Sequence, residues 1–366
     1  MRLSLTLSRY IGWNFLNNFI LVFVVFFGII FLIDTVELLR RASNHDNVGL
    51  GLVSQMGLMK LPFIAQQIFP FAVLFAGMIS FGRLTRTSEL VVTRAAGVSA
   101  WQFLLPVLFV ALLLGIFKVS AFNPLASAML SEYDRLNSVH LKGQSNLLAI
   151  SKNGLWLRQS TGKDQSVIHA PKMTIIKNEI SLSEVSIFVY EGGHKFVSRI
   201  NANKADLEDG FWHLRDVWIN VTDKPVKFIK EYWVETDINL NSIHESFSPP
   251  ETMSFWDLPE FIANLERSGF SALRHRLYWH SLLSSPLLLC AMVLIAATFT
   301  LRQTRRANTT FIIVGGVLTG FLLFFFSDVI LALGLRESIP VVLAAWTPSG
   351  ISTLLGLTMV FHLEDG

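Results

Sequence analysis

The sequence has a single cysteine, Cys290, among its 366 residues, and that cysteine lies in an apolar stretch. One thiol cannot form an intramolecular disulfide or build a cysteine metal cluster. Charged residues make up only 16% of the chain, against about 25% in ordinary soluble domains. Hydrophobic residues make up 52%. A soluble domain of this composition would expose large apolar patches, so these values exclude one and indicate a membrane protein.

The sequence also lacks the short motifs of common catalytic and nucleotide-binding sites. No Walker A loop, H-E-x-x-H or G-x-S-x-G pattern occurs, and Gly162-Lys163 lacks the other residues of a phosphate-binding loop. His275 and His280 are five residues apart, which does not place them on one helix face as an i, i+4 spacing would. We therefore expect no catalytic residue, no metal, no cofactor and no enzymatic activity.

Charge is concentrated in the middle of the chain. Residues 123–276 are about 23% charged, whereas the remainder is about 10% charged. The middle part has a small acidic excess, which offers no basic surface for nucleic acid. We predict three parts: membrane helices in residues 1–122, a folded domain in residues 123–276, and further membrane helices in residues 277–366.

Six apolar runs are long enough to cross a bilayer, because a membrane-spanning helix needs about 20 mostly apolar residues. They are residues 11–33, 61–82, 101–122, 277–301, 311–335 and 339–361. The first run is too long for the apolar part of a signal peptide and lacks a cleavage site, so we expect it to stay as an anchor.

The orientation follows from positive charge, which is enriched in short cytoplasmic segments. Six spans place both termini on one side. If that side is the cytoplasm, the inner segments carry eight arginines: Arg2, Arg9, Arg83, Arg86, Arg94, Arg302, Arg305 and Arg306. The short outer loops then carry four basic residues: Arg40, Arg41, Lys60 and Arg336. This bias predicts cytoplasmic termini and an extracytoplasmic domain at 123–276.

The middle domain contains many short alternating runs separated by turn residues, which is typical of an all-β sandwich or a related half-open sheet. Asn153-Gly154 between two such runs is a strong hairpin signal. After Pro249-Pro250 the period changes, and an amphipathic helix containing Leu258 is expected to lead back to the membrane.

The short cytoplasmic loop at 83–100 also predicts a helix. Ser88 or Thr87 is expected to cap it, with Glu89 in its first turn and Gly97 at its end. This helix is either an ordinary solvated surface helix or a coupling helix that docks into a cytoplasmic motor.

Several of these segments resemble the LptF/LptG family of lipopolysaccharide export permeases over essentially the whole chain. The end of the first span, with Ile33-Asp34 and Arg40-Arg41, and the run LAAWTP at 343–348 resemble the LptG branch. The other matching motifs are Arg9-Tyr10-Ile11-Gly12, Ser88-Glu89-Leu90-Val91-Val92 and Arg94-Ala95-Ala96-Gly97.

The resemblance implies a fold, partners and a location. The expected fold class is an α-helical membrane protein with six spans and an inserted, β-jellyroll-like periplasmic domain. The implied partners are an LptF-type permease, a dimer of LptB-type ATPases, LptC and a bridge of LptA, with lipopolysaccharide as substrate and the bacterial inner membrane as location. The residues implied to couple to the ATPase are Glu89, Ser88, Arg86 and Arg94.

A lipid path needs basic groups at headgroup height and apolar walls below them. The candidate rim residues are Arg40, Arg41, Lys118 and Arg336, and the candidate wall residues are Phe26, Phe31, Phe321 and Phe325. The polar residues at or within spans are Asp34 and Asp328. Plainer explanations remain open: extension of Lys118 to the interface, a hydrogen bond from Asp328 to Ser327 or to a neighbouring helix, and phenylalanines that face lipid.

We therefore expect a permease subunit that extracts lipopolysaccharide from the outer leaflet and passes it to a periplasmic bridge, with ATP hydrolysed on partner subunits. The alternative is a membrane scaffold or mechanotransmission protein that uses its β domain to position partners. An apolar β-domain interior with open ends favours the permease, and a filled, closed core favours the scaffold.

Overall fold

The computed structural model describes residues 5–42, 50–95, 97–137, 148–151, 154–161, 164–176, 179–191, 195–208, 210–221, 225–236, 249–267, 271–301 and 309–365. The chain divides into two compact units. The first, called the membrane unit, comprises Met1–Leu141, Glu251–Trp256 and Arg276–Gly366. The second, called the β unit, comprises Lys142–Pro250 and Asp257–His275.

The membrane unit confirms the six predicted spans: within the described residues, six helices are long and apolar enough to cross a bilayer. They are α1 (Leu5–Ala42), α2 (Leu50–Arg86), α4 (Ala100–Phe117), α8 (Leu273–Thr300), α9 (Thr309–Leu335) and α10 (Val341–Asp365). The third span continues past α4 through a π-helical turn, η1 (Lys118–Phe122), into α5 (Asn123–Asn137).

The helices extend beyond their predicted ends. α1 has 38 residues and α2 has 37, so each is about 56 Å long at 1.5 Å per residue, nearly twice the roughly 30 Å hydrocarbon core. Hydropathy marks only the part of a helix that is apolar enough for lipid. The polar extensions are stabilised by packing instead: at one end of the unit, Leu38, Met56 and Tyr133 form a cluster between α1, α2 and α5.

The spans differ strongly in how much of their surface other helices cover. The most apolar windows of α2 and α8 are 61% buried, whereas those of α1 and α9 are 11% buried. Close helix contacts occur where small residues allow them. At Gly115 of α4 a Cβ atom would lie 2.5 Å from the Cα atom of Pro286 in α8, and at Gly320 of α9 it would lie 2.9 Å from Leu74 in α2. α2 and α8 are therefore the centre of the unit, and α1 and α9 are peripheral.

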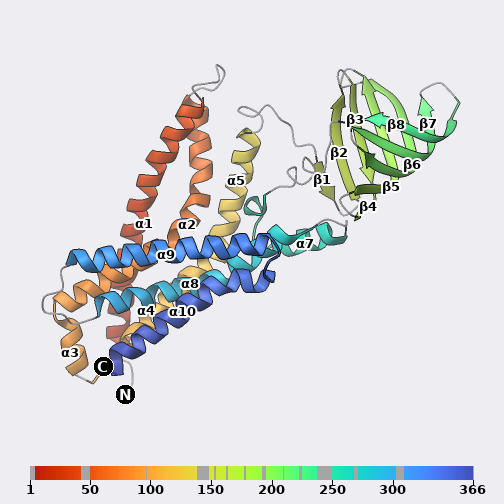
Figure 1. The fold of residues 1–366 in the computed structure, drawn as a ribbon. Helices are drawn as coiled ribbons and strands as arrows, with labels where there is room; N and C mark the ends of the chain where they lie inside the picture. The colour runs from red at the N-terminus through yellow and green to blue at the C-terminus, as the bar shows by residue number, and fades with distance from the viewer. Residues whose placement is uncertain are drawn as a thin grey trace. The chain divides into compact units, whose positions relative to one another are not determined.

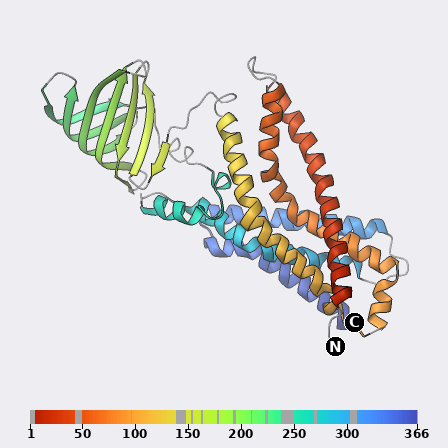
Figure 2. The same ribbon diagram turned by 180° about the vertical axis from the view of Figure 1, so that it is seen from behind.

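The start of α1, the end of α10 and the short helix α3 (Glu89–Ala95) lie at the same end of the membrane unit (Figure 1, Figure 2). Helix direction explains this, because six crossings return the chain to the end at which it started. The predicted grouping of both termini with the loop at 83–100 agrees with this geometry.

The β unit is built on one antiparallel sheet in which most strands pair with the strands before and after them in the chain. The strands are β1 (Leu148–Ser151), β2 (Gly154–Thr161), β3 (Asp164–Ala170), β4 (Lys172–Ile176), β5 (Glu179–Glu191), β6 (Lys195–Glu208), β7 (Phe211–Val221) and β8 (Lys227–Glu235). β3 and β4 both pair with β5, one after the other, and Pro171 separates them. The prediction of an inserted all-β domain is confirmed, and its described topology is a series of consecutive hairpins (Figure 1).

The sheet bends around its own core. Inward-facing residues normally recur at every second position of a strand, but in three adjacent strands one interval is three residues, as at a β-bulge. Glu184 and Asp216 lie within two of these intervals, with φ of 58° and 53°. The buried positions on either side are Leu182 and Val185 in β5, Ala202 and Ala205 in β6, and Leu214 and Val217 in β7. Because the irregularities lie side by side across the sheet, they bend it along one line.

The bend brings distant strands together at one end of the β unit. The buried side chain of Gln159 in β2 accepts a hydrogen bond from the Thr236 hydroxyl at 2.7 Å and donates one to the Glu235 carbonyl at 3.1 Å. We call this contact the Gln159 bridge. The helix α7 (Leu258–Arg267) packs Leu265 against the same core.

The β-unit interior is apolar, but it is filled by the chain's own side chains, and Trp212 is fully buried in it. An interior with open ends was the expectation for a lipid path, and the described residues do not show one. The physical reason is the sharp bend, which lets a single sheet close on its own side chains.

Candidate functional site

The connection between α2 and α4 contains the predicted coupling helix. α3 begins at Glu89, in whose first turn a carboxylate is favourable. The expectation that Ser88 caps it is wrong: Ser88 has φ of 59°, whereas an N-cap residue is extended. Instead the Thr87 hydroxyl contacts a Glu89 carboxylate oxygen at 2.9 Å. Gly97, with φ of 82°, ends the segment as predicted.

α3 is anchored on one face and open on the other. Leu90 is buried in the main hydrophobic core, whereas Val92 is 67% exposed. Just before α3, the Thr85 hydroxyl lies 3.2 Å from the carbonyl oxygen of Thr300, which ties the segment to the end of α8. A short helix held in this way has a fixed position and one exposed face.

The remaining predicted coupling residues belong to α3 and to the end of α2. Arg86 is exposed in the last turn of α2. Arg94 belongs to α3, but its side chain lies outside the described residues. Glu89 is half-buried.

The paired arginines at the end of α1 share one carboxylate. The Nε atom of Arg40 donates to Glu37 at 2.9 Å and that of Arg41 at 2.8 Å. Their side chains are 76% and 60% exposed. Two guanidinium groups therefore stand beside one carboxylate at this helix end. Sequence reasoning identified the arginines but missed Glu37, although its i, i+3 and i, i+4 spacing was a readable signal.

About one turn before Glu37 in α1, Asp34 forms an ion pair with Lys60 of α2, and both side chains are mostly buried. The Lys60 ammonium also lies 5.8 Å from the centre of the Tyr133 ring. Within the described residues, no hydrogen bond reaches the second, buried carboxylate oxygen of Asp34. Sequence analysis counted Lys60 only as a loop charge. The signal was that Asp34 and Lys60 sit at the outer ends of adjacent predicted spans.

Lys118 lies apart from these groups, in the π-helical turn η1. It is only 9% exposed, so it does not extend freely to the interface. Its ammonium is 5.9 Å from the centre of the Phe69 ring. Within the described part of the chain, no carboxylate pairs with it. Among the residues that the structure describes, the Phe69 ring gives the ammonium a stabilising cation–π contact.

The predicted apolar wall residues divide into two groups. Phe26 turns inward and contacts Phe75, with ring centres 5.6 Å apart, and Phe31 is half-buried. Phe321 and Phe325 of α9 are each 60% exposed. The structure therefore places the α9 pair, and not Phe26, on an outward surface.

Asp328 lies on the same outward face of α9 as Phe321 and Phe325, because the positions are separated by about one helical turn. It is exposed, and no hydrogen bond to it occurs within the described residues. Ser327 does not bond it, since the Ser327 hydroxyl donates to the Leu323 carbonyl at 2.9 Å. Arg336 is exposed in the turn that follows α9.

These features match known proteins along nearly the whole chain. The family model described as "Lipopolysaccharide export system permease LptF/LptG" matches residues 9–361. The protein named lipopolysaccharide export system permease protein LptG from Haemophilus influenzae is 24% identical over 98% of both chains. The protein of the same name from Escherichia coli K12 is 24% identical over 97% of this chain and 98% of its own.

Proposed function

The chain belongs to the LptF/LptG family of lipopolysaccharide export system permeases, and from that premise we propose that it is the LptG-type subunit of a lipopolysaccharide exporter in the bacterial inner membrane. It acts with an LptF-type permease, an LptB-type ATPase dimer, LptC and an LptA bridge. The β unit lies in the periplasm, and the termini lie in the cytoplasm. Family membership over residues 9–361, together with six apolar spans, carries the proposal.

The proposed task is to take lipopolysaccharide from the outer leaflet and pass it toward the periplasmic bridge. Because the family is one of export permeases, we prefer this function to the scaffold alternative, although the filled β-unit interior would fit a scaffold. Acyl chains can enter that interior only if the sheet opens, so we expect the Gln159 bridge to separate when lipid passes through this β unit.

ATP hydrolysis on the partner reaches this chain through α3. Glu89 supplies the negative charge, Thr87 orients it, and Arg86 and Arg94 flank it. Glu89→Ala is expected to weaken ATPase binding or to separate ATP hydrolysis from lipid export, and Thr87→Val is expected to have a milder effect because the charge remains. Co-purification of the ATPase and ATP-dependent export measure both. Glu132→Ala, at the opposite end of the membrane unit, is the control. Normal ATPase binding and normal export by Glu89→Ala would show that α3 is an ordinary surface helix.

The anionic headgroup is received at the outer end of α1. Arg40 and Arg41 present two largely exposed guanidinium groups there, and a charge-assisted contact to a phosphate is worth about 1.5–3 kcal/mol. Changing both to Ala should reduce crosslinking of lipopolysaccharide, and changing both to Lys should be milder, because the charge remains while the guanidinium geometry is lost. Arg302 and Arg305 on the inner side provide the matched double-alanine control. Equal crosslinking in all variants at equal expression would show that the headgroup site lies elsewhere.

The partner permease covers the outward faces of α1 and α9. Apolar side chains alone could face lipid, but an ionisable residue in a span normally faces protein or a water-filled cavity. Asp328 is such a residue, and we expect a hydrogen-bond donor or cation of the partner opposite it. Asp328→Leu should reduce co-purification of the partner permease more than Asp328→Asn does, whereas equal recovery of the partner with both variants would place Asp328 outside the interface.

A further inference from the structure

Six residues of the chain leave the β unit and return to it. Glu251–Trp256 belong to the membrane unit, although Lys142–Pro250 before them and Asp257–His275 after them belong to the β unit. We call Glu251–Trp256 the return segment. Its attachments that the structure describes join it to the π-helical turn of the third span and to α8.

The first attachment is a hydrogen bond to a backbone carbonyl beside a proline. Pro124 has no N–H group, so it cannot donate to the carbonyl of Ser120 four residues earlier. The indole Nε1 of Trp256 donates to that Ser120 carbonyl at 3.1 Å. A proline and a π-helical turn are also the two common causes of a helix kink. The return segment is thus bonded to the point at which the third span is able to bend.

The second attachment runs through Asn123, which is fully buried. Its Oδ1 atom accepts a hydrogen bond from the Phe255 backbone N–H at 2.8 Å. Its Nδ2 atom lies 3.3 Å from Gln66 Oε1 of α2 and 3.3 Å from the Tyr278 hydroxyl of α8. One side chain therefore joins the return segment to three spans.

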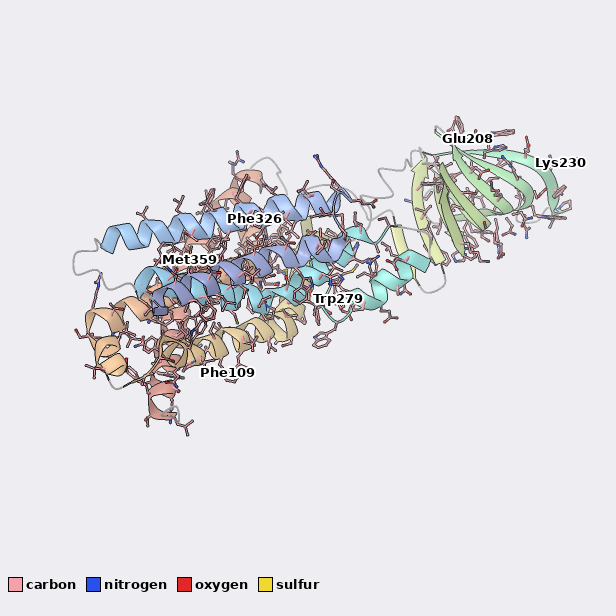
Figure 3. The ribbon with its side chains drawn as sticks, turned by 60° about the horizontal axis from the view of Figure 1, so that its bottom comes forward. Phe109, Glu208, Lys230, Trp279, Phe326 and Met359 are labelled. Carbon is pink, nitrogen blue, oxygen red and sulfur yellow. The ribbon has the colours of Figure 1, made fainter. Side chains whose placement is uncertain are left out.

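The third attachment is aromatic. The Phe255 ring stacks on Trp279 of α8, with ring centres 6.2 Å apart and planes 13° apart. Figure 3 labels Trp279 on α8. The ring of Trp256 packs edge-on against Phe255, at 5.1 Å. Asn123 is fully buried in this network, whereas Trp256 is 62% exposed. A network with several fixed points transmits displacement, because it cannot deform without breaking several bonds at once.

We propose that the return segment is the mechanical link between the two units: bending of the third span at its π-helical turn moves Ser120 and Asn123, and the return segment passes that movement to the β unit. Asn123 and Trp256 are positioning residues in this proposal. The inference rests on the proposed transport function, since it assigns the route by which ATP-driven change in the membrane unit reaches the β unit.

Three variants test the link in the assembled exporter. Trp256→Phe keeps the ring and removes the indole donor. Pro124→Ala gives the helix an N–H that competes for the Ser120 carbonyl, and it leaves the return segment itself unchanged. Asn123→Ala removes the buried hub. Trp13→Phe, at an exposed tryptophan near the start of α1, is the matched control.

Two measurements are made on each variant: hydrogen exchange of the Phe255 and Trp256 amides, and lipopolysaccharide crosslinked to the β unit per ATP hydrolysed. Loss of one net hydrogen bond should speed exchange by about twofold to tenfold. We expect faster exchange and less β-unit crosslinking per ATP in Trp256→Phe and Pro124→Ala, with the ATPase rate retained and the control unchanged.

Faster exchange with unchanged crosslinking per ATP would overturn the link and reduce the return segment to an anchor. Unchanged exchange in both variants would overturn the docking itself. A wild-type exporter that transfers no lipid on ATP hydrolysis would overturn the proposed function and the link that depends on it. This result differs from failure of the link alone, because it appears before any substitution is made.

Discussion

The Gln159 bridge holds two distant strands of the β unit together, and Gln159→Leu is the change that tests its strength. The substitution keeps the side-chain size close to the original and removes both hydrogen bonds. It leaves the Thr236 hydroxyl and the Glu235 carbonyl without these partners, in a place where Gln159 is 1% exposed and Thr236 is 7% exposed.

The magnitude follows from burial. Each hydrogen bond contributes about 0.5–1.5 kcal/mol net, and each buried partner left unsatisfied costs about 1–3 kcal/mol. Water can reach part of an opened edge, so we expect the free energy of local opening to fall by about 2–4 kcal/mol. Amide exchange in β2 and at the end of β8 should accelerate roughly 30-fold or more, while exchange in the β5–β6 pair changes little.

A double variant isolates the cause. In Gln159→Leu with Thr236→Val, the Thr236 hydroxyl is also removed, so of the two groups that bond Gln159 only the Glu235 carbonyl still lacks that partner. Replacing both partners is less costly than replacing one, so the double variant should recover part of the loss, to about 1–2 kcal/mol. Unchanged exchange in the single variant, or a double variant worse than the sum of its parts, would refute the reasoning that these bonds hold the bent sheet closed.

Three further changes test other parts of the structure. Lys60→Met leaves the mostly buried Asp34 charge without its Lys60 partner and should lower the free energy of unfolding by about 3–5 kcal/mol. The double variant Lys60→Met with Asp34→Leu should lose less stability. Thermal unfolding in detergent measures both. Gly115→Leu places a side chain against the backbone of α8 and should lower the melting temperature, while Gly28→Leu, which meets nothing within 4 Å, should not. Burial raises the pKa of Asp206, but hydrogen bonds from Ser181 and Lys204 outweigh burial and hold the pKa below its usual value. The carboxylate should therefore stabilise the β unit above the unfolded-state pKa near 4. That contribution is lost as the pH falls through the lower folded-state pKa. Asp206→Asn should remove this part of the acid sensitivity, as measured by hydrogen exchange.

The spans were predictable because lipid imposes a composition that hydropathy detects directly. The ends of the helices were not, since the outer turns of α1 are stabilised by contacts such as Leu38 with Met56, which hydropathy does not register. The β strands were visible as alternating runs, but the bend along Glu184 and Asp216 was not, because it depends on one irregular residue in each of several neighbouring strands.

The candidate site shows the same division. Arg40 and Arg41 stood out because they oppose the positive-inside trend, yet the carboxylate that holds them, Glu37, was overlooked. Contacts between residues far apart in the chain were invisible in the sequence. Asn123 with Phe255 joins positions 132 residues apart, and no local pattern reports such a contact.

The most direct test of the account is lipopolysaccharide transfer by the purified, reconstituted exporter. Proteoliposomes would contain this chain, its partner permease, LptC, the ATPase and lipopolysaccharide, with a soluble LptA-type acceptor outside. The account predicts that lipopolysaccharide reaches the acceptor when ATP is added, and that transfer stops when ATP is omitted or Glu89→Ala replaces the wild-type chain. ATP hydrolysis by the assembled complex without any lipopolysaccharide on the acceptor would contradict it.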